Sequence, residues 1–345
     1  MALRLTAGAT SSFVQRGERL WVMGDNREGQ LGGPELRVLT DPTPLTLESS
    51  VAGVAAGRDC TFFLSAGTVW VTGRDECGRT GLGRVGEVQA RPVKVETMSG
   101  VTQVAAGDYH TLFLAEGVWV CGCNERGQLG REPESPNDCD SVPRLLSLPV
   151  VVVQVTAREC HSLLRTAEGL VYAFGANDRG QLGLGHRRDQ PQPTRVELVA
   201  QTVLAVGQGS YALTESGLWS WGANEFGQLG LGHALDQDKP QRVIGPTVTH
   251  VAAGRHHLLV LAPGGQVWGC GSDHQNQLGL NVDVMLSLRP LRWLHRRAVM
   301  TVGAGHYHSL VGLEDGTVLS FGLNGHGQLG MGTVGPSKGI FLYSI

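Results

Sequence analysis

The chain has 345 residues, of which 50 are glycine, and a formal net charge of −3 at neutral pH. Glycine at roughly twice its ordinary usage, without a collagen period, indicates many tight turns. The balanced charge, without a block of like charges, predicts neither a basic nor an acidic tail, so we expect no nucleic-acid partner. Seven cysteines, an odd number, favour a reduced intracellular chain over a disulfide framework.

The apolar stretches of the chain are short. Residues 1–8 carry an early charge and no apolar run of the length of a signal peptide, and the segment 148–153 is far too short to span a bilayer. We therefore expect a soluble, monomeric protein of the cytoplasm, the nucleus or both, without a membrane partner.

Four elements recur in the same order along the chain. The first is Val-Ala-Ala-Gly and the second is His-Ser/Thr followed by apolar residues. The third is Trp-x-x-Gly with a polar loop that ends in Gln-Leu-Gly, as in WVCGCNERGQLG at 119–130. The fourth is Pro, any residue, often Lys or Arg, and then an apolar residue. Short runs of alternating apolar and polar residues, bounded by Gly, Pro and Asn, predict that each element is a β-strand.

Each of these elements occurs seven times with one period. The Val-Ala-Ala-Gly copies begin at Leu5, Val54, Val104, Val155, Leu204, Val251 and Val302. The first glycine of the third element falls at 24, 73, 122, 175, 222, 271 and 322, and the prolines of the fourth element at 44, 92, 143, 193, 240, 290 and 336. Four strands in a period near fifty residues are typical of a propeller blade. The sequence therefore predicts an all-β fold, a seven-bladed β-propeller of four-stranded blades, as a single domain over 1–345.

The ends of the chain suggest how such a ring closes. The chain opens on a Val-Ala-Ala-Gly element and ends just after a Pro element, which we interpret as complementary fragments of one shared blade. We expect the strand near Ile340–Tyr343 to pair beside Leu3–Ala7, so that no free sheet edge remains. Deletion of the last ten residues should then lower the global stability.

The motifs resemble the RCC1 family, propellers named for the regulator of chromosome condensation. The resemblance covers the whole chain and is carried by GANDRGQLGLG at 175–185, GANEFGQLGLG at 222–232 and VAAGDYHTLFL at 104–114. It implies the propeller fold. It does not fix one function, because the family includes exchange factors, ubiquitin-ligase modules, a plant light sensor and scaffolds.

Side chains that follow the period are interpreted as structural. His110, His161, His257 and His308 share one register, with Ser11, Cys60 and Ser210 in the other blades. We expect these histidines to form hydrogen bonds within or between blades, and the repeated tryptophans at 21, 70, 119, 219 and 268 to be core residues. The cysteines at 121, 123 and 139 lack zinc-like spacing. No catalytic residue, metal site or cofactor is predicted, and so no enzyme.

Side chains that break the period are the candidate site. The two residues between Gly and His of the first two elements vary from blade to blade, and these turns should surround one face of the ring. A rigid scaffold that presents variable charged and aromatic residues suits protein binding. The predicted partner-binding residues are Arg58, Asp59, Asp108, Tyr109, Glu159, Arg255, His256, His306 and Tyr307.

The family resemblance also supplies an alternative function. In the family's exchange factor, acidic and imidazole residues at these turns help to engage the small GTPase Ran, and Asp108 and His256 fall at matching registers here. Cys160 occupies the intervening acidic position, with Glu159 adjacent. The segment 122–130 has the ordinary repeat length, without the wedge-like insertion that the exchange factor carries there. The basic N-terminal tail of that factor has no counterpart in the printed sequence. The Gly-Trp-Arg motif of the family's light sensor does not occur either.

We therefore weigh two functions. The first is a non-enzymatic protein–protein interaction module that uses the variable turn face; the alternative is a guanine-nucleotide exchange factor for a Ran-like small GTPase. A basic cluster at Arg292, Arg296 and Arg297 with His295 is interpreted as a solvated surface, with a docking patch for an acidic partner as the other interpretation.

Overall fold

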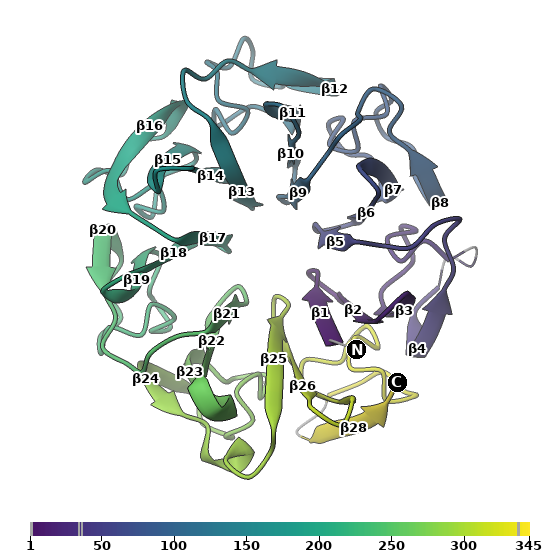
Figure 1. Cartoon of the computed structure of the whole chain (residues 1–345), viewed down its shortest axis with the longest axis vertical. Helices are drawn as coiled ribbons and strands as arrows, with labels where there is room; N and C mark the ends of the chain where they lie inside the picture. The colour runs from purple at the N-terminus through teal and green to yellow at the C-terminus, as the bar shows by residue number, and fades with distance from the viewer. Residues whose placement is uncertain (1–2, 34, 36, 337–338) are drawn as a thin grey trace.

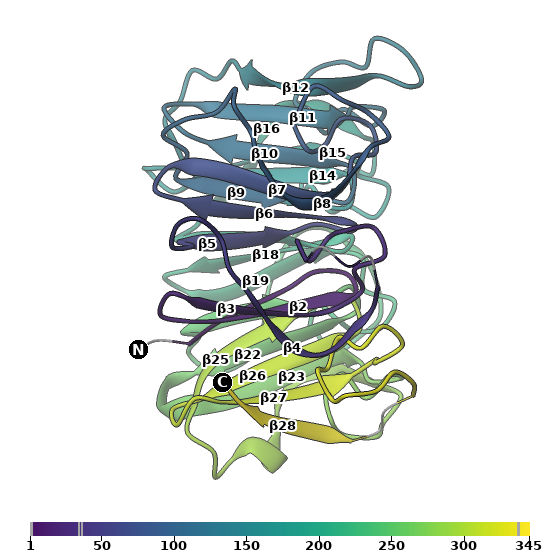
Figure 2. The same ribbon diagram turned by 90° about the vertical axis from the view of Figure 1, so that its right-hand side faces the viewer.

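The computed structural model describes residues 3–33, 35, 37–336 and 339–345. Over these residues the chain forms seven four-stranded antiparallel sheets, arranged as the blades of a closed ring (Figure 1). Seen edge-on, the strands run across the thickness of the ring, so that the connections gather on its two flat faces (Figure 2). The prediction of a seven-bladed propeller is confirmed.

Each blade uses four consecutive strands, from the innermost to the outermost. The first three blades are β1 (Leu3–Ala7), β2 (Ser11–Arg16), β3 (Arg19–Gly24) and β4 (Leu39–Leu45); β5 (Gly53–Ala56), β6 (Cys60–Ser65), β7 (Thr68–Arg74) and β8 (Val88–Lys94); and β9 (Gln103–Ala106), β10 (His110–Leu114), β11 (Val118–Cys123) and β12 (Cys139–Leu146). The next two are β13 (Val152–Arg158), β14 (His161–Thr166), β15 (Leu170–Gly175) and β16 (Gln190–Val199), followed by β17 (Thr202–Val206), β18 (Gly209–Thr214), β19 (Gly217–Gly222) and β20 (Gln237–Arg242).

The sixth and seventh blades have the same order. They comprise β21 (His250–Ala253), β22 (His257–Ala262), β23 (Gln266–Ser272) and β24 (Val284–Pro290), and β25 (Val299–Ala304), β26 (His308–Leu313), β27 (Thr317–Gly322) and β28 (Ile340–Ser344). Two short 3-10 turns lie at Pro263–Gly265 and Arg292–Leu294. The four sequence elements are thus the four strands of a blade, with Val-Ala-Ala-Gly lining the centre.

The predicted pairing of the terminal strands is wrong. β1 belongs to the first blade and β28 to the last, and β28 pairs only with β27 in the described sheets. The seam between these two blades is closed by side-chain packing and hydrogen bonds instead of strand pairing. Leu3 and Leu5 of β1 lie against Gly312 and Gly303 of the seventh blade, where an added Cβ would come within 2.5 and 3.1 Å of their side chains.

The core lies between neighbouring blades, where the apolar faces of successive sheets meet. Phe62 and Phe113 make an edge contact with their ring centroids 5.7 Å apart, across the second and third blades. Trp221 is fully buried, as predicted. The repeated tryptophans at 21, 70, 119, 219 and 268 are only partly buried. Those at 70, 119, 219 and 268 pack against the border of the core clusters between blades.

The predicted hydrogen bonding of the repeated histidines is confirmed, and it joins adjacent blades. Nε2 of His110 lies 2.8 Å from Oγ of Ser162 in the next blade. Since that hydroxyl donates its proton to the carbonyl of Gln128, it accepts from the imidazole. His161, His257 and His308 make the same contact with serines of the following blade, at 3.1, 2.9 and 2.8 Å.

Candidate protein-binding face

The turn between the first two strands of a blade is fixed by its backbone. In each of the seven described blades, the carbonyl of the second turn residue accepts a hydrogen bond from the amide that follows the third strand's final glycine, as from Cys123 to Tyr109 at 2.9 Å. That glycine is required: Gly122 has φ of 105°, and a Cβ there would lie 2.4 Å from the Tyr109 oxygen. The turn backbone is therefore constant while its side chains vary.

One turn differs from its predicted position. Gly209, not Ser210, pairs with Gly222 at the register of the repeated histidines. The variable turn of the fifth blade is therefore Gly207–Gln208 rather than Gln208–Gly209. In this blade Val206 replaces the glycine of the repeat, and Gly207 takes the positive φ of 51°.

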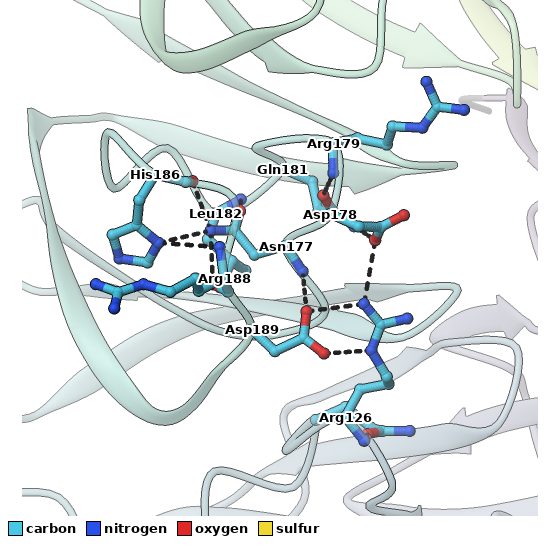
Figure 3. Close-up of polar contacts among 10 residues, drawn as sticks. Arg126, Asn177, Asp178, Arg179, Gln181, Leu182, His186, Arg188 and Asp189 are labelled. Atoms are coloured by element: carbon cyan, nitrogen blue, oxygen red, sulfur yellow. Dashed lines mark hydrogen bonds and ion pairs between the residues drawn. The ribbon is translucent and has the colours of Figure 1, made fainter.

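The loops that carry Gln-Leu-Gly lie on the same face as these turns and are linked from blade to blade. Asn177 begins one such loop, and its Oδ1 accepts a hydrogen bond from the Leu182 amide at 3.0 Å. Arg126 of the preceding blade reaches into this loop (Figure 3), where Nη2 lies 2.7 Å from Asp189 and 3.2 Å from Asp178. These ion pairs tie the rim of the face together.

Over the second and third blades, the face presents an arginine and a tyrosine side by side. Arg58 Nη1 donates to the Tyr109 hydroxyl at 2.5 Å, and its guanidinium carbon lies 5.7 Å from the ring centroid. Asp59 lies 3.6 Å from Arg58 and 3.7 Å from Arg79, an arginine that is fully buried in the loop register of the repeated glutamine. Burial raises the pKa of Asp59, and the two arginines oppose that shift.

Over the fifth to seventh blades, the face presents a row of rings. Phe226 packs on His256 with centroids 4.5 Å apart, and His256 lies 5.7 Å from Tyr307. Beside them, Arg255 Nε is 3.2 Å from a carboxylate oxygen of Glu159 across the ring. Burial, helped by the charge of Arg255, lowers the pKa of His256 to about 4, so the imidazole is neutral at physiological pH.

Polar groups without partners gather where the turns approach the axis of the ring. Arg158 takes the place of the repeat's glycine and donates from Nη1 to the Ala56 carbonyl of the second blade, 3.3 Å away. Asp108 and His306 are each 8% exposed. Among the described residues, Oδ1 of Asp108 and Nε2 of His306 have no hydrogen-bond partner.

Charged side chains near the axis of the ring shift the pKa values of their neighbours. Burial raises the pKa of Glu159, against the lowering influence of Arg255, and the same residue has a positive φ of 42°. Burial and the charges of Arg158 and Arg255 hold the pKa of His306 well below its usual range. Near the axis of the ring, arginine and carboxylate side chains therefore lie beside a neutral imidazole, and the backbone is strained at Glu159.

The structure places all nine predicted residues at turns of one face. Seven are at least partly exposed, whereas Asp108 and His306 are buried. Sequence reasoning missed Arg158 and Phe226. A signal existed for both: Arg158 interrupts the glycine register, and Phe226 stands where other loops carry a polar residue or cysteine.

Within the described residues, no group of three or more His, Cys, Asp or Glu side chains is arranged to hold a metal ion. The part of the chain that the structure describes also has no helix long and apolar enough to cross a membrane.

Comparison with known proteins identifies the repeat. The model of the Regulator of chromosome condensation (RCC1) repeat matches residues 66–114, 116–164, 168–211 and 215–261, more than half of the chain. A second model of that description matches 101–128, 248–277 and 301–328. Fold and motifs together define a seven-bladed propeller of the RCC1 type. The chain belongs to the RCC1 repeat family.

Individual relatives are similar over parts of their length. The human probable E3 ubiquitin-protein ligase HERC3 is 36% identical over 47% of this chain, which spans 16% of that protein. The mouse RCC1-like G exchanging factor-like protein is 29% identical over 59% of this chain and 53% of its own length. The chain thus spans about half or less of these two relatives.

A solved structure shows the same fold. Prp20p from Saccharomyces cerevisiae, described together with its binding to Gsp1p and histones, superposes with a TM-score of 0.79 at 22% identity. The match covers 92% of this chain and 84% of that one.

Proposed function

We propose that this propeller is a non-enzymatic protein-binding module, and that the face with the variable turns is its binding surface. The observation that carries the proposal is the pairing of a constant turn backbone with exposed aromatic and arginine side chains on one face. Tyr109 with Arg58 forms one such group, and Phe226 with His256 and Tyr307 forms the other. Tyrosine and arginine are the residue types that most often dominate binding energy at interfaces.

Two further features support a protein partner. The turn backbone is held by the sheet, so that binding orders few additional groups and loses little conformational entropy. The partner-binding of Prp20p is described for a propeller of the same fold. We propose that the protein acts as an intracellular monomer, which size-exclusion chromatography with light scattering would test.

The second candidate is a nucleotide exchange factor for a small GTPase. Asp108 and His256 favour it, because they lie in turns of the third and sixth blades at the registers where the family's exchange factor engages its GTPase. The buried Asp108 carboxylate, with one oxygen unpartnered among the described residues, could act on a GTPase electrostatically without covalent chemistry. In the third blade the loop from Asn124 to Asp138 follows the ordinary repeat and carries no added strand.

One experiment separates the two functions. Release of fluorescent GDP is measured from a panel of small GTPases with and without the full chain. Acceleration that is lost in Asp108→Asn establishes exchange and refutes the non-enzymatic module. Absence of acceleration, together with binding of a purified partner that Tyr109→Ala and Phe226→Ala weaken, establishes the binding module.

The control for both assays is Arg195→Ala. This arginine is exposed on β16, an outermost strand, away from the turns. If Arg195→Ala weakens binding as much as the turn variants do, the turn face is not the binding surface.

A further inference from the structure

A second surface lies on the outer rim of the ring, between the outermost strands of the fifth and sixth blades, β20 and β24 (Figure 1). A hollow of about 460 Å³ separates them there. Its apolar lining includes Leu231, Ile244, Trp268 and Leu288. Ile244 is 91% exposed, so that its side chain at the border of the hollow is accessible to a partner.

The same hollow is bordered by two arginines and by no carboxylate. Arg242 ends β20 and Arg289 lies near the end of β24; both line the hollow and both are exposed. Within the described residues neither has a carboxylate within 4.0 Å, whereas Arg126 and Arg179 on the turn face are paired. Among the described residues, the Arg242 guanidinium donates from Nε to the Ser216 carbonyl, 3.0 Å away.

The positive charge continues along the chain beyond β24. Arg292, Arg296 and Arg297 follow this strand, and none of the three has an ion pair among the described residues. Because these positive charges have no negative partners nearby, they should attract an anionic partner to this rim.

We propose that the groove between β20 and β24 binds an acidic peptide segment of a partner protein. One large apolar side chain of the peptide would occupy the hollow beside Ile244 and Trp268. Flanking carboxylates would meet Arg242 and Arg289. An apolar anchor in a pocket with charged contacts at its border is a common mode of peptide recognition.

This surface is distinct from the turn face. Its residues lie on the outermost strands and in the connections beside them, whereas each variable turn follows the innermost strand of its blade. The apolar hollow favours a peptide over a nucleic acid, because a phosphate backbone would leave Ile244 and Leu231 without an apolar contact. A variant that abolishes binding at one surface should therefore leave binding at the other surface unchanged.

Fluorescence anisotropy of labelled peptides tests the proposal with the full chain. The first peptide has a central leucine flanked by glutamates; in the second, lysines replace the glutamates; in the third, serine replaces the leucine. We expect only the first to bind well, and its affinity to fall as salt is added. Combined Arg242→Glu and Arg289→Glu should weaken it at least about tenfold, and Ile244→Ser should also weaken it.

Arg195→Glu is the matched control. Arg195 pairs with Tyr172 as Arg242 pairs with Trp219, so it holds the same register on the outermost strand of the fourth blade. Its reversal should leave the affinity unchanged. The proposal is overturned if the acidic peptide does not bind, if the lysine peptide binds equally, or if the double reversal has no effect. Competition by a single-stranded oligonucleotide at equal strength would also overturn it.

Discussion

Replacement of Ser12 by alanine tests how the ring is held closed. The Ser12 hydroxyl is fully buried at the seam between the last and first blades. It lies 2.8 Å from Nε2 of His308 and donates to the Gln328 carbonyl, also at 2.8 Å. Both partners belong to the seventh blade, so Ser12→Ala removes two contacts across the seam and adds no bulk.

The expected cost follows from the groups left behind. The imidazole N–H of His308 and the carbonyl of Gln328 would stay buried without a partner, at about 1–3 kcal/mol each. We expect a total loss of about 2–4 kcal/mol in the free energy of unfolding, since partial relaxation recovers part of the sum. For a chain of this length, that corresponds to a fall of roughly 3–6 °C in Tm.

Urea unfolding followed by tryptophan fluorescence measures this loss, with Ser162→Ala as the matched variant. Ser162 makes the same two contacts between the third and fourth blades, at 2.8 and 3.2 Å. A peptide connection crosses that seam, whereas none crosses the seam at Ser12. Ser12→Ala should therefore cost at least as much as Ser162→Ala. A Ser12→Ala protein that unfolds at the wild-type urea concentration would refute the reasoning.

Three further outcomes are expected. The free energy of unfolding should fall as the pH drops from about 6.5 towards about 4. Burial lowers the pKa of His161 and of His308 to about 4, so that in this window the unfolded chain binds protons that the folded chain does not bind. Urea midpoints that do not change over this window would contradict the prediction. Gly122→Ala should lower the free energy of unfolding by at least about 1–3 kcal/mol through backbone strain at positive φ. Gly53→Ala, where an added Cβ meets nothing within 4 Å, should leave it nearly unchanged. Thermal melts of the two variants measure the difference. Deletion of residues 340–345 should lower Tm and promote association in size-exclusion chromatography, because it bares the edge of β27 and removes Tyr343 and Ile345 from Val14 and Met23; a truncated protein that melts like the full chain would argue against this.

The repeated features of the fold could be predicted from sequence because they are overdetermined. Seven copies of each strand element fix the number of blades, and a histidine present in four of them had to serve structure. The point in the repeat at which each blade begins could not be predicted in this way. A period shows which elements recur, but not which one lies at the centre, so a shared terminal blade and a blade for each terminus fit the sequence equally well.

The positions of the variable turns could be predicted only where the turn keeps its regular place in the repeat. The predicted turn of the fifth blade lies one residue too late along the chain. Val206 stands where the glycine of the repeat was expected, so the next residue, Gly207, was taken for that glycine. Arg158 shows the opposite case. It interrupts the glycine register visibly in the sequence, but its hydrogen bond to the Ala56 carbonyl of the second blade depends on the curvature of the whole ring.

The hydrogen bond that holds each turn by its carbonyl has a consequence for how such a surface can change over time. Because the support comes from main-chain atoms and one glycine, either side chain of a turn such as Asp108–Tyr109 can be exchanged while that bond remains. Substitutions in turns that share no contact should then combine nearly additively. The ring can acquire a new partner by a series of small, separate steps, each of which leaves the fold almost as stable as before.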